Sequence, residues 1–209
     1  MSQDGKSQDG KSHNGAARGG GEPTRRPSRP DPIRCSRFLS WVLRHVPHEV
    51  GVHLDRAGWA EVDAVLAACR AHGMRLDRRG LARLVAQSDK QRFMLSPDGR
   101  RIRAVQGHSV PVQLGHPERE PPARLYHGTV ARSLDSIRRE GLRPGSRHHV
   151  HLSAEPDTAA AVGRRRGAPV VLTIHAEAMR AGGHRFYLSP NGVWLTDRVP
   201  PRFLDIPPA

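Results

Sequence analysis

The sequence contains only two cysteines and no long apolar run. Cys35 and Cys69 are too few for a disulfide framework and fall in helix-like segments, so we expect both to be small buried hydrophobic residues. The polar N-terminus lacks the apolar stretch of a signal peptide, and no apolar run reaches the roughly 18 residues that a membrane span needs. These absences exclude a disulfide-stabilised scaffold and a membrane-spanning helix, and we expect a cytoplasmic protein.

Acidic side chains are scarce relative to basic ones: 20 Asp and Glu stand against 34 Lys and Arg, a net charge of +14. The excess is +2 in residues 1–33, +6 in 34–123 and +6 in 124–209. A basic tail therefore does not explain the charge, and the balance indicates a polyanionic partner for both later segments. The alternative is coding bias, because the sequence is rich in Arg and Ala and poor in Lys.

Residues 1–33 contain the repeat SQDGK and many Gly, Pro and Arg residues. Such a segment cannot bury enough surface to offset its ordering entropy, so we predict a disordered tail. From Arg34 the apolar spacing predicts a helix that ends before Pro47, and residues 50–55 resemble a short strand.

Two further helices are predicted, at 63–72 and after the N-cap Asp77. They precede a hairpin that turns at Pro97-Asp98-Gly99. Helices followed by a basic hairpin indicate a winged-helix-like lobe at 34–115, and the proline-rich segment 116–123 indicates a linker.

Residues 124–209 contain short strand-like runs, namely RLYHGT, HVHLS, APVVLTIHA, HRFYLS and GVWLT. Helical segments are predicted at 131–140 and 157–166, and Pro190-Asn191-Gly192 predicts a hairpin turn. Because the pattern is too irregular for successive βαβ units, we expect an α+β fold.

Arg44, His45, Arg92 and Arg147 are cations on otherwise apolar segments without nearby carboxylates. Arginine binds phosphate through a planar fork, and histidine can move a proton near neutral pH. The hypothesis is a pocket for a reactive phosphate. The alternatives are that Arg44 and His45 neutralise a helix dipole and that Arg92 is an exposed cation.

His127, Gly128 and Thr129 follow directly after a short strand at Leu125-Tyr126, where glycine permits a close backbone approach to a ligand. Alternation on the later strand places His151 and Ser153 on one face. Closely spaced histidines can bind zinc, but no Cys or acidic residue completes a ligand set, so we expect no metal. The chain also lacks a Walker-type loop and a Gly-rich dinucleotide fingerprint, which argues against P-loop and Rossmann sites.

Together these segments resemble the tRNA 2′-phosphotransferase family over residues 34–206. The resemblance rests on LSWVLRH, DRAGWAEVDAVL, SDKQRFMLSPDGRRIRAVQGHS, LYHGT, RHHVHLS, VGRRRGAPVVLTI and FYLSPNGVWLT. It implies a winged-helix N-terminal lobe that binds RNA phosphate and an NAD-binding, ADP-ribosyltransferase-like C-terminal lobe at 124–209. It also implies a metal-free reaction in which NAD is consumed as a co-substrate.

In that family an internal RNA 2′-phosphate, left by ligation in tRNA splicing or RNA repair, attacks the nicotinamide ribose of NAD. The ribose 2″-hydroxyl then attacks the phosphate, giving 2′-OH RNA, ADP-ribose 1″,2″-cyclic phosphate and nicotinamide. The resemblance assigns the catalytic roles to Arg44, His45, Arg92 and Arg147. It places NAD at His127, Gly128, Thr129, His151, Ser153 and Val193.

Val193 stands where many protein-modifying relatives have a glutamate, which favours a phosphorylated acceptor. We expect a monomer that acts on tRNA-like RNA. One alternative is an ADP-ribosyltransferase that caps terminal phosphates of nucleic acids. Another is a winged-helix nucleic-acid-binding protein whose third helix offers Arg78, Arg79 and Arg83.

Overall fold

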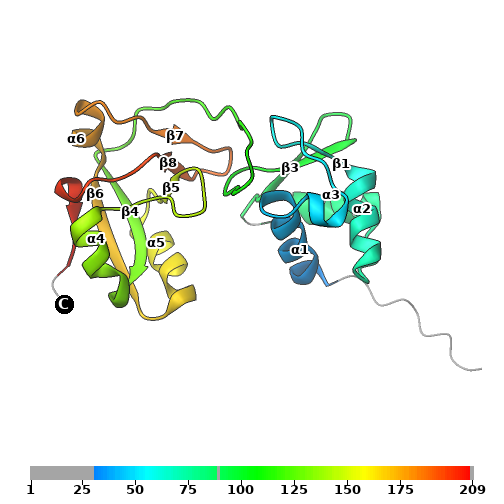
Figure 1. Cartoon of the computed structure of the whole chain (residues 1–209), viewed down its shortest axis with the longest axis horizontal. Helices are drawn as coiled ribbons and strands as arrows, with labels where there is room; N and C mark the ends of the chain where they lie inside the picture. The colour runs from blue at the N-terminus through cyan, green and yellow to red at the C-terminus, as the bar shows by residue number, and fades with distance from the viewer. Residues whose placement is uncertain (1–30, 89, 208–209) are drawn as a thin grey trace, which may run out of the picture.

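The computed structural model describes residues 31–88 and 90–207. The predicted disordered tail lies outside these residues except for its last three, which form the N-cap and first turn of a helix. Figure 1 shows the described chain as two groups of elements, N-terminal and C-terminal, lying side by side. Both contain helices and antiparallel strands, so the predicted mixture of α and β structure is confirmed.

The N-terminal half contains, in chain order, α1 (Pro32–Arg44), β1 (Ala60–Glu61), α2 (Val62–Ala71), α3 (Arg78–Ala86), β2 (Phe93–Leu95) and β3 (Arg101–Ala104). Helix α1 begins two residues before its predicted start because Asp31 caps it: the Asp31 side chain accepts a hydrogen bond from the Ile33 amide. Asp77 caps α3 in the same way, as predicted, by accepting from the Gly80 amide.

The predicted hairpin around Pro97-Asp98-Gly99 is confirmed, since β2 pairs antiparallel with β3. Strand β1 pairs with the other edge of β3 and gives the order β1-β3-β2. The predicted strand at 50–55 is wrong. The chain there forms a 3-10 turn over His48–Val50 and then a left-handed Gly51 with φ of 70°.

The C-terminal half contains β4 (Arg124–Val130), α4 (Leu134–Glu140), β5 (Val150–Leu152), α5 (Pro156–Gly163), β6 (Pro169–His175), α6 (Ala176–Ala181), β7 (Tyr187–Leu188), β8 (Trp194–Thr196) and β9 (Leu204–Asp205). Its antiparallel sheets have the orders β4-β6-β9 and β5-β8-β7. The five predicted strands and the two predicted helical segments are confirmed, whereas α6 and β9 were not predicted.

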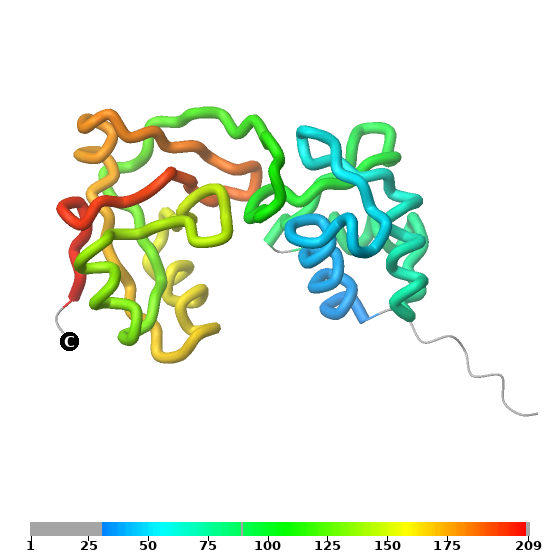
Figure 2. Tube along the Cα trace, viewed as in Figure 1, coloured from blue at the N-terminus to red at the C-terminus, as the bar shows by residue number. Residues whose placement is uncertain are grey.

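Each half has its own apolar core. Cys35 and Cys69, both free, lie in the N-terminal core with Leu39 and Leu43, and a second core surrounds Leu125 on β4. Figure 2 shows the green segment that carries the chain from one half to the other. Part of this predicted linker pairs with the C-terminal half, because the Arg119 amide donates to the Phe186 carbonyl oxygen at 2.9 Å.

None of the helices in residues 31–88 and 90–207 is long and apolar enough to cross a membrane.

Candidate active site

Arg44 is the last residue of α1, and burial of Leu39, Val42 and Leu43 on the opposite side of the helix fixes its position. Its guanidinium lies over Gly107, where a Cβ atom would stand 3.7 Å from the Arg44 side chain. Arg44 Nε and Nη2 are buried and have no hydrogen-bond partner among the described residues. The group is therefore a buried cation with unused donors, which is costly unless an anion binds it.

Burial, together with the positive charges of Arg147 and Arg92, lowers the pKa of Arg44 to about 10. Arg92 directly precedes β2 in the N-terminal half, whereas Arg147 lies in the loop before β5 in the C-terminal half. The structure therefore brings three predicted arginines from both halves close enough for their charges to interact.

His45 caps the C-terminus of α1, and its Nδ1 lies 2.9 Å from the Ser109 hydroxyl oxygen. The Ser109 hydroxyl can donate to the Arg44 carbonyl oxygen at 3.4 Å, which leaves its own oxygen free to accept from His45 Nδ1–H. That tautomer makes His45 Nε2 the nitrogen that can accept a proton. Burial, with the charges of Arg44 and Arg147, lowers the pKa of His45, so its neutral form is favoured.

An open cleft of about 820 Å³ contains Arg44, His45 and Arg92, and Arg165 from the C-terminal half also lines it. Burial lowers the pKa of Arg92 and of Arg147; the positive charge of Arg165 lowers that of Arg92 further, and the charges of Arg166 and Arg165 lower that of Arg147 further. In the described part of the chain, none of these arginines forms an ion pair with a carboxylate. A cluster of like charges without counter-ions is suited to a multiply charged anion such as a phosphate.

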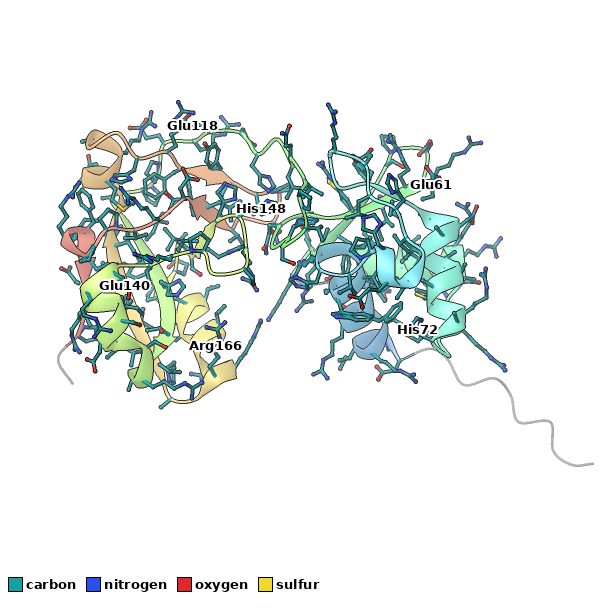
Figure 3. The ribbon with its side chains drawn as sticks, in the orientation of Figure 1. Glu61, His72, Glu118, Glu140, His148 and Arg166 are labelled. Carbon is teal, nitrogen blue, oxygen red and sulfur yellow. The ribbon has the colours of Figure 1, made fainter. Side chains whose placement is uncertain are left out.

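The two halves also meet through hydrogen bonding beside this cleft. Asn191, in the turn between β7 and β8, donates from Nδ2 to the Lys90 carbonyl oxygen at 2.9 Å. The predicted site residue Val193 follows two positions later, and its amide donates to the Ser189 hydroxyl at 3.0 Å. The turn that holds Val193 is therefore tied to the loop that precedes Arg92. Figure 3 shows His148, next to Arg147 in sequence, on the side of the C-terminal half that faces the N-terminal half.

His127 on β4 and His151 on β5 lie beside each other. His127 Nδ1–H donates to the His151 carbonyl oxygen at 3.0 Å, which makes Nε2 of the neutral ring an acceptor. His151 Nε2 is buried without a partner among the described residues. Burial, reinforced by the charge of Arg147, lowers the pKa of His151 to about 3. Both neutral imidazoles can hydrogen-bond the hydroxyl groups of a sugar.

The other predicted residues surround this pair. Ser153 pairs through its backbone with Tyr126 on β4, and Thr129 is buried at 5 % exposure. A Cβ atom at Gly128 would overlap the carbonyl oxygen of Ala159 on α5. The glycine therefore allows α5 to pack closely on β4, and the close approach predicted there is made by a helix.

A smaller cavity of about 280 Å³ lies beside His151, and its histidine lining consists of His108, His116, His148, His149 and His151. Within residues 31–88 and 90–207, no group of three or more His, Cys, Asp or Glu side chains has a metal-binding arrangement. His108 is 2 % exposed, and neither of its ring nitrogens has a partner among those residues.

Sequence reasoning assigned no role to Ser109, Gly107 or Arg165, which contact or surround the predicted cations. Their signals were present in the QGHS and RRR segments. A serine or glycine in a loop, however, does not reveal which distant helix end it contacts. Arg165 was indistinguishable in sequence from its neighbours Arg164 and Arg166.

Comparison with known proteins shows which family the chain resembles. Residues 30–198 match the family described as RNA 2′-phosphotransferase, Tpt1/KptA family. The chain is 59% identical over 171 residues to a probable RNA 2′-phosphotransferase of Agrobacterium fabrum, covering 82% of this chain and 92% of the relative. A Burkholderia lata protein with the same description is 56% identical over 176 residues, covering 84% and 91%. A Streptomyces griseus one is 52% identical over 179 residues, covering 82% and 95%. With this match over most of its length, the chain belongs to the RNA 2′-phosphotransferase family.

Proposed function

We propose that this enzyme removes an internal 2′-phosphate from RNA in two steps and consumes NAD as a co-substrate. The observation that carries the proposal is the buried Arg44 guanidinium, whose Nε and Nη2 have no partner among the described residues. The charges of Arg92 and Arg147 act on it, and its own charge lowers the pKa of the adjacent His45 after burial has done so. A 2′-phosphate is an anion that would use those donors and offset the repulsion among the arginines.

Two lobes support the proposal. The order α1-β1-α2-α3-β2-β3 with the sheet order β1-β3-β2 fits a winged-helix lobe, to which Arg44, His45 and Arg92 belong. The antiparallel sheets that follow fit an ADP-ribosyltransferase-like lobe, to which Arg147 belongs. We infer that the phosphate lies between the lobes. In this proposal the tail is residues 1–33, the RNA-binding lobe is 34–115, the linker is 116–123 and the NAD-binding lobe is 124–209.

The NAD site of the proposal lies along β4 and β5. His127 would accept a hydrogen bond from a ribose hydroxyl through Nε2, because its Nδ1–H is already used by the His151 carbonyl oxygen. The buried, unpartnered His151 Nε2 would bind a second polar group of the dinucleotide. Gly128, Thr129, Ser153 and Val193 would border the same site.

In the first step an oxygen of the RNA 2′-phosphate bonds to the anomeric carbon of the nicotinamide ribose as the bond to nicotinamide breaks. In the second, the oxygen of the ribose 2″-hydroxyl bonds to phosphorus and gives up its proton, and the RNA 2′-oxygen leaves and takes up a proton. Neutral His45, held through Nδ1 by Ser109, can carry that proton on Nε2. Arg44, Arg92 and Arg147 would stabilise the charge on the phosphoryl oxygens.

The test is an oligonucleotide with one internal 2′-phosphate, incubated with and without NAD. We expect loss of the phosphate and formation of ADP-ribose cyclic phosphate only with NAD. Arg44→Lys should lower kcat/KM by about 100-fold or more, because an ammonium cannot reproduce the guanidinium fork. The charge-matched control is Arg139→Lys on the exposed surface of α4, which should retain full activity. Phosphate loss without NAD would contradict the proposal.

A further inference from the structure

One face of α1 remains exposed along its whole length and leads to Arg44. Ile33, Arg37 and Trp41 are spaced four residues apart and share that face, which we call the α1 stripe. Ile33 is 65% exposed and Trp41 is 42% exposed. A helix of this length extends about 20 Å, so the stripe provides a track that ends at the candidate active site.

The α1 stripe forms one wall of the 820 Å³ cleft that contains Arg44 and His45. The end of α3, Lys90, Arg92 and Arg165 also line the cleft. The described lining residues include no Asp or Glu, although both aromatic and cationic side chains are present. An aromatic face beside cations and without carboxylates is the composition of surfaces that bind single-stranded nucleic acid.

We infer that the α1 stripe binds the single-stranded RNA that flanks the 2′-phosphate. One base stacks on the Trp41 indole, and Arg37 and Arg165 contact backbone phosphates on the two sides of the cleft. This inference rests on the proposed function, which makes RNA the substrate and places its 2′-phosphate at Arg44. It adds the surface that holds the neighbouring nucleotides and selects an unstacked strand over a duplex.

Trp41 is suited to this role because its ring is fixed while much of its surface stays open. It packs against Phe38 with ring centroids 6.0 Å apart, and Phe38 in turn packs against the N-terminal core. An indole held from one side loses little conformational entropy when a base stacks on it. The position one turn before His45 keeps the stacked base close to the reacting phosphate.

The surface differs from the one that many winged-helix proteins use, which is the exposed face of the third helix. Here the Arg78 guanidinium of α3 is paired with the Asp63 carboxylate at 2.6 Å. Helix α3 enters the cleft with its C-terminal end, at Leu84, Gln87 and Ser88. The cation cluster thus lies nearer to α1 than to the exposed arginines of α3.

The first experiment measures binding of a fluorescent seven-nucleotide RNA that has no 2′-phosphate, without NAD. Trp41→Ala should weaken binding about 5- to 150-fold, the effect of losing one base stack, and Trp41→Phe should restore most of it. Arg37→Gln should weaken binding and reduce the slope of log K against log salt by about 0.7. Arg79→Gln, a charge-matched change on the exposed face of α3, should leave affinity and slope unchanged.

The second experiment measures KM for substrates that carry the 2′-phosphate. Trp41→Ala should raise KM more for a seven-nucleotide substrate than for a dinucleotide. Thermal unfolding of each variant checks that the substituted side chain is not needed for folding, and we expect midpoints close to that of the wild type.

Equal affinity of wild type and Trp41→Ala would overturn the inference, even if phosphate removal proceeds. If Arg79→Gln weakened RNA binding and Arg37→Gln did not, the RNA would bind on α3, and this result would also overturn the inference. If a blunt RNA duplex bound as tightly as the single strand or more tightly, the inference that the α1 stripe holds a single strand would be overturned. If Trp41-dependent binding is observed but no phosphate is removed, the proposed chemistry fails while the binding surface stands.

Discussion

His108 makes the stability of this protein dependent on pH in a way that can be calculated. The residue follows β3, is 2% exposed and has no hydrogen-bond partner for either ring nitrogen among the described residues. Burial lowers its pKa from 6.5 to about 3, and the charge of Arg44 adds to this effect. The folded protein therefore keeps His108 neutral at pH values at which the unfolded chain is protonated.

The direction of the change in stability with pH follows from proton binding. Between the two pKa values the unfolded chain binds a proton at His108 that the folded protein does not bind, so stability falls as pH falls below 6.5. The slope approaches about 1.4 kcal/mol per pH unit and ends near the folded pKa. From about pH 7 to about pH 4.5, the loss attributable to this histidine is about 2.5 kcal/mol.

The assay is urea unfolding of the wild type and His108→Leu at several pH values in this range. The leucine variant should lose about 2.5 kcal/mol less than the wild type between about pH 7 and about pH 4.5. Val52→Ala, which truncates a buried residue without changing any ionisable group, should shift the curve equally at every pH. Parallel curves for the wild type and His108→Leu would refute the reasoning.

Two more outcomes are expected. Gly128→Ala should lower the free energy of unfolding by about 3 kcal/mol, because the new Cβ overlaps the Ala159 carbonyl oxygen; a loss below about 1 kcal/mol in urea unfolding would show that α5 can move aside. The imidazole of His45 should titrate below pH 6.5 in the NMR spectrum of the free enzyme, since burial and the charge of Arg44 lower its pKa. A midpoint above 6.5, assigned by loss of the signal in His45→Gln, would contradict the burial of His45 beside the charge of Arg44.

Local patterns predicted most of the secondary structure. The helices of the N-terminal half, the hairpin and the C-terminal strands other than β9 follow from apolar spacing, caps and turn residues, all of which act over a few positions. The α+β mixture followed from the same patterns.

The error at residues 50–55 has a physical cause. Val50, Val52 and Leu54 all pack against the N-terminal core, so the alternation correctly reported burial. A strand also needs a partner. The Val50 and Val52 amides instead donate to the Pro47 carbonyl oxygen, at 3.3 and 2.9 Å. A segment whose alternate residues are buried, but whose backbone does not pair with another strand, is a loop packed on the core and not a β-strand.

The site was predictable as a set of cations and not as a geometry. Arg44 and Arg147 are separated by more than a hundred residues, and their proximity depends on how the two halves pack. The role of Gly128 was also misjudged because it depends on long-range packing: the space that a Cβ atom would need is occupied by the backbone of α5. The residue types indicated the chemistry of the site. Only the long-range packing of the chain shows that Ser109 and Arg165 belong to it.

The electrostatics of the cleft explain why the two halves would act together. Burial lowers the pKa of Arg44 and of Arg147, and neighbouring cations lower both further, Arg147 and Arg92 for Arg44, and Arg166 and Arg165 for Arg147. Each guanidinium charge is therefore destabilised by like charges around it. Within the described residues no carboxylate relieves this repulsion, so the cluster costs free energy in the empty protein. A dianion bound between the halves removes that cost and gives Arg44 Nε and Nη2 their missing acceptors. Because Arg44 and Arg147 belong to different halves, the proposed phosphate would contact both halves and would also hold them in the reactive arrangement.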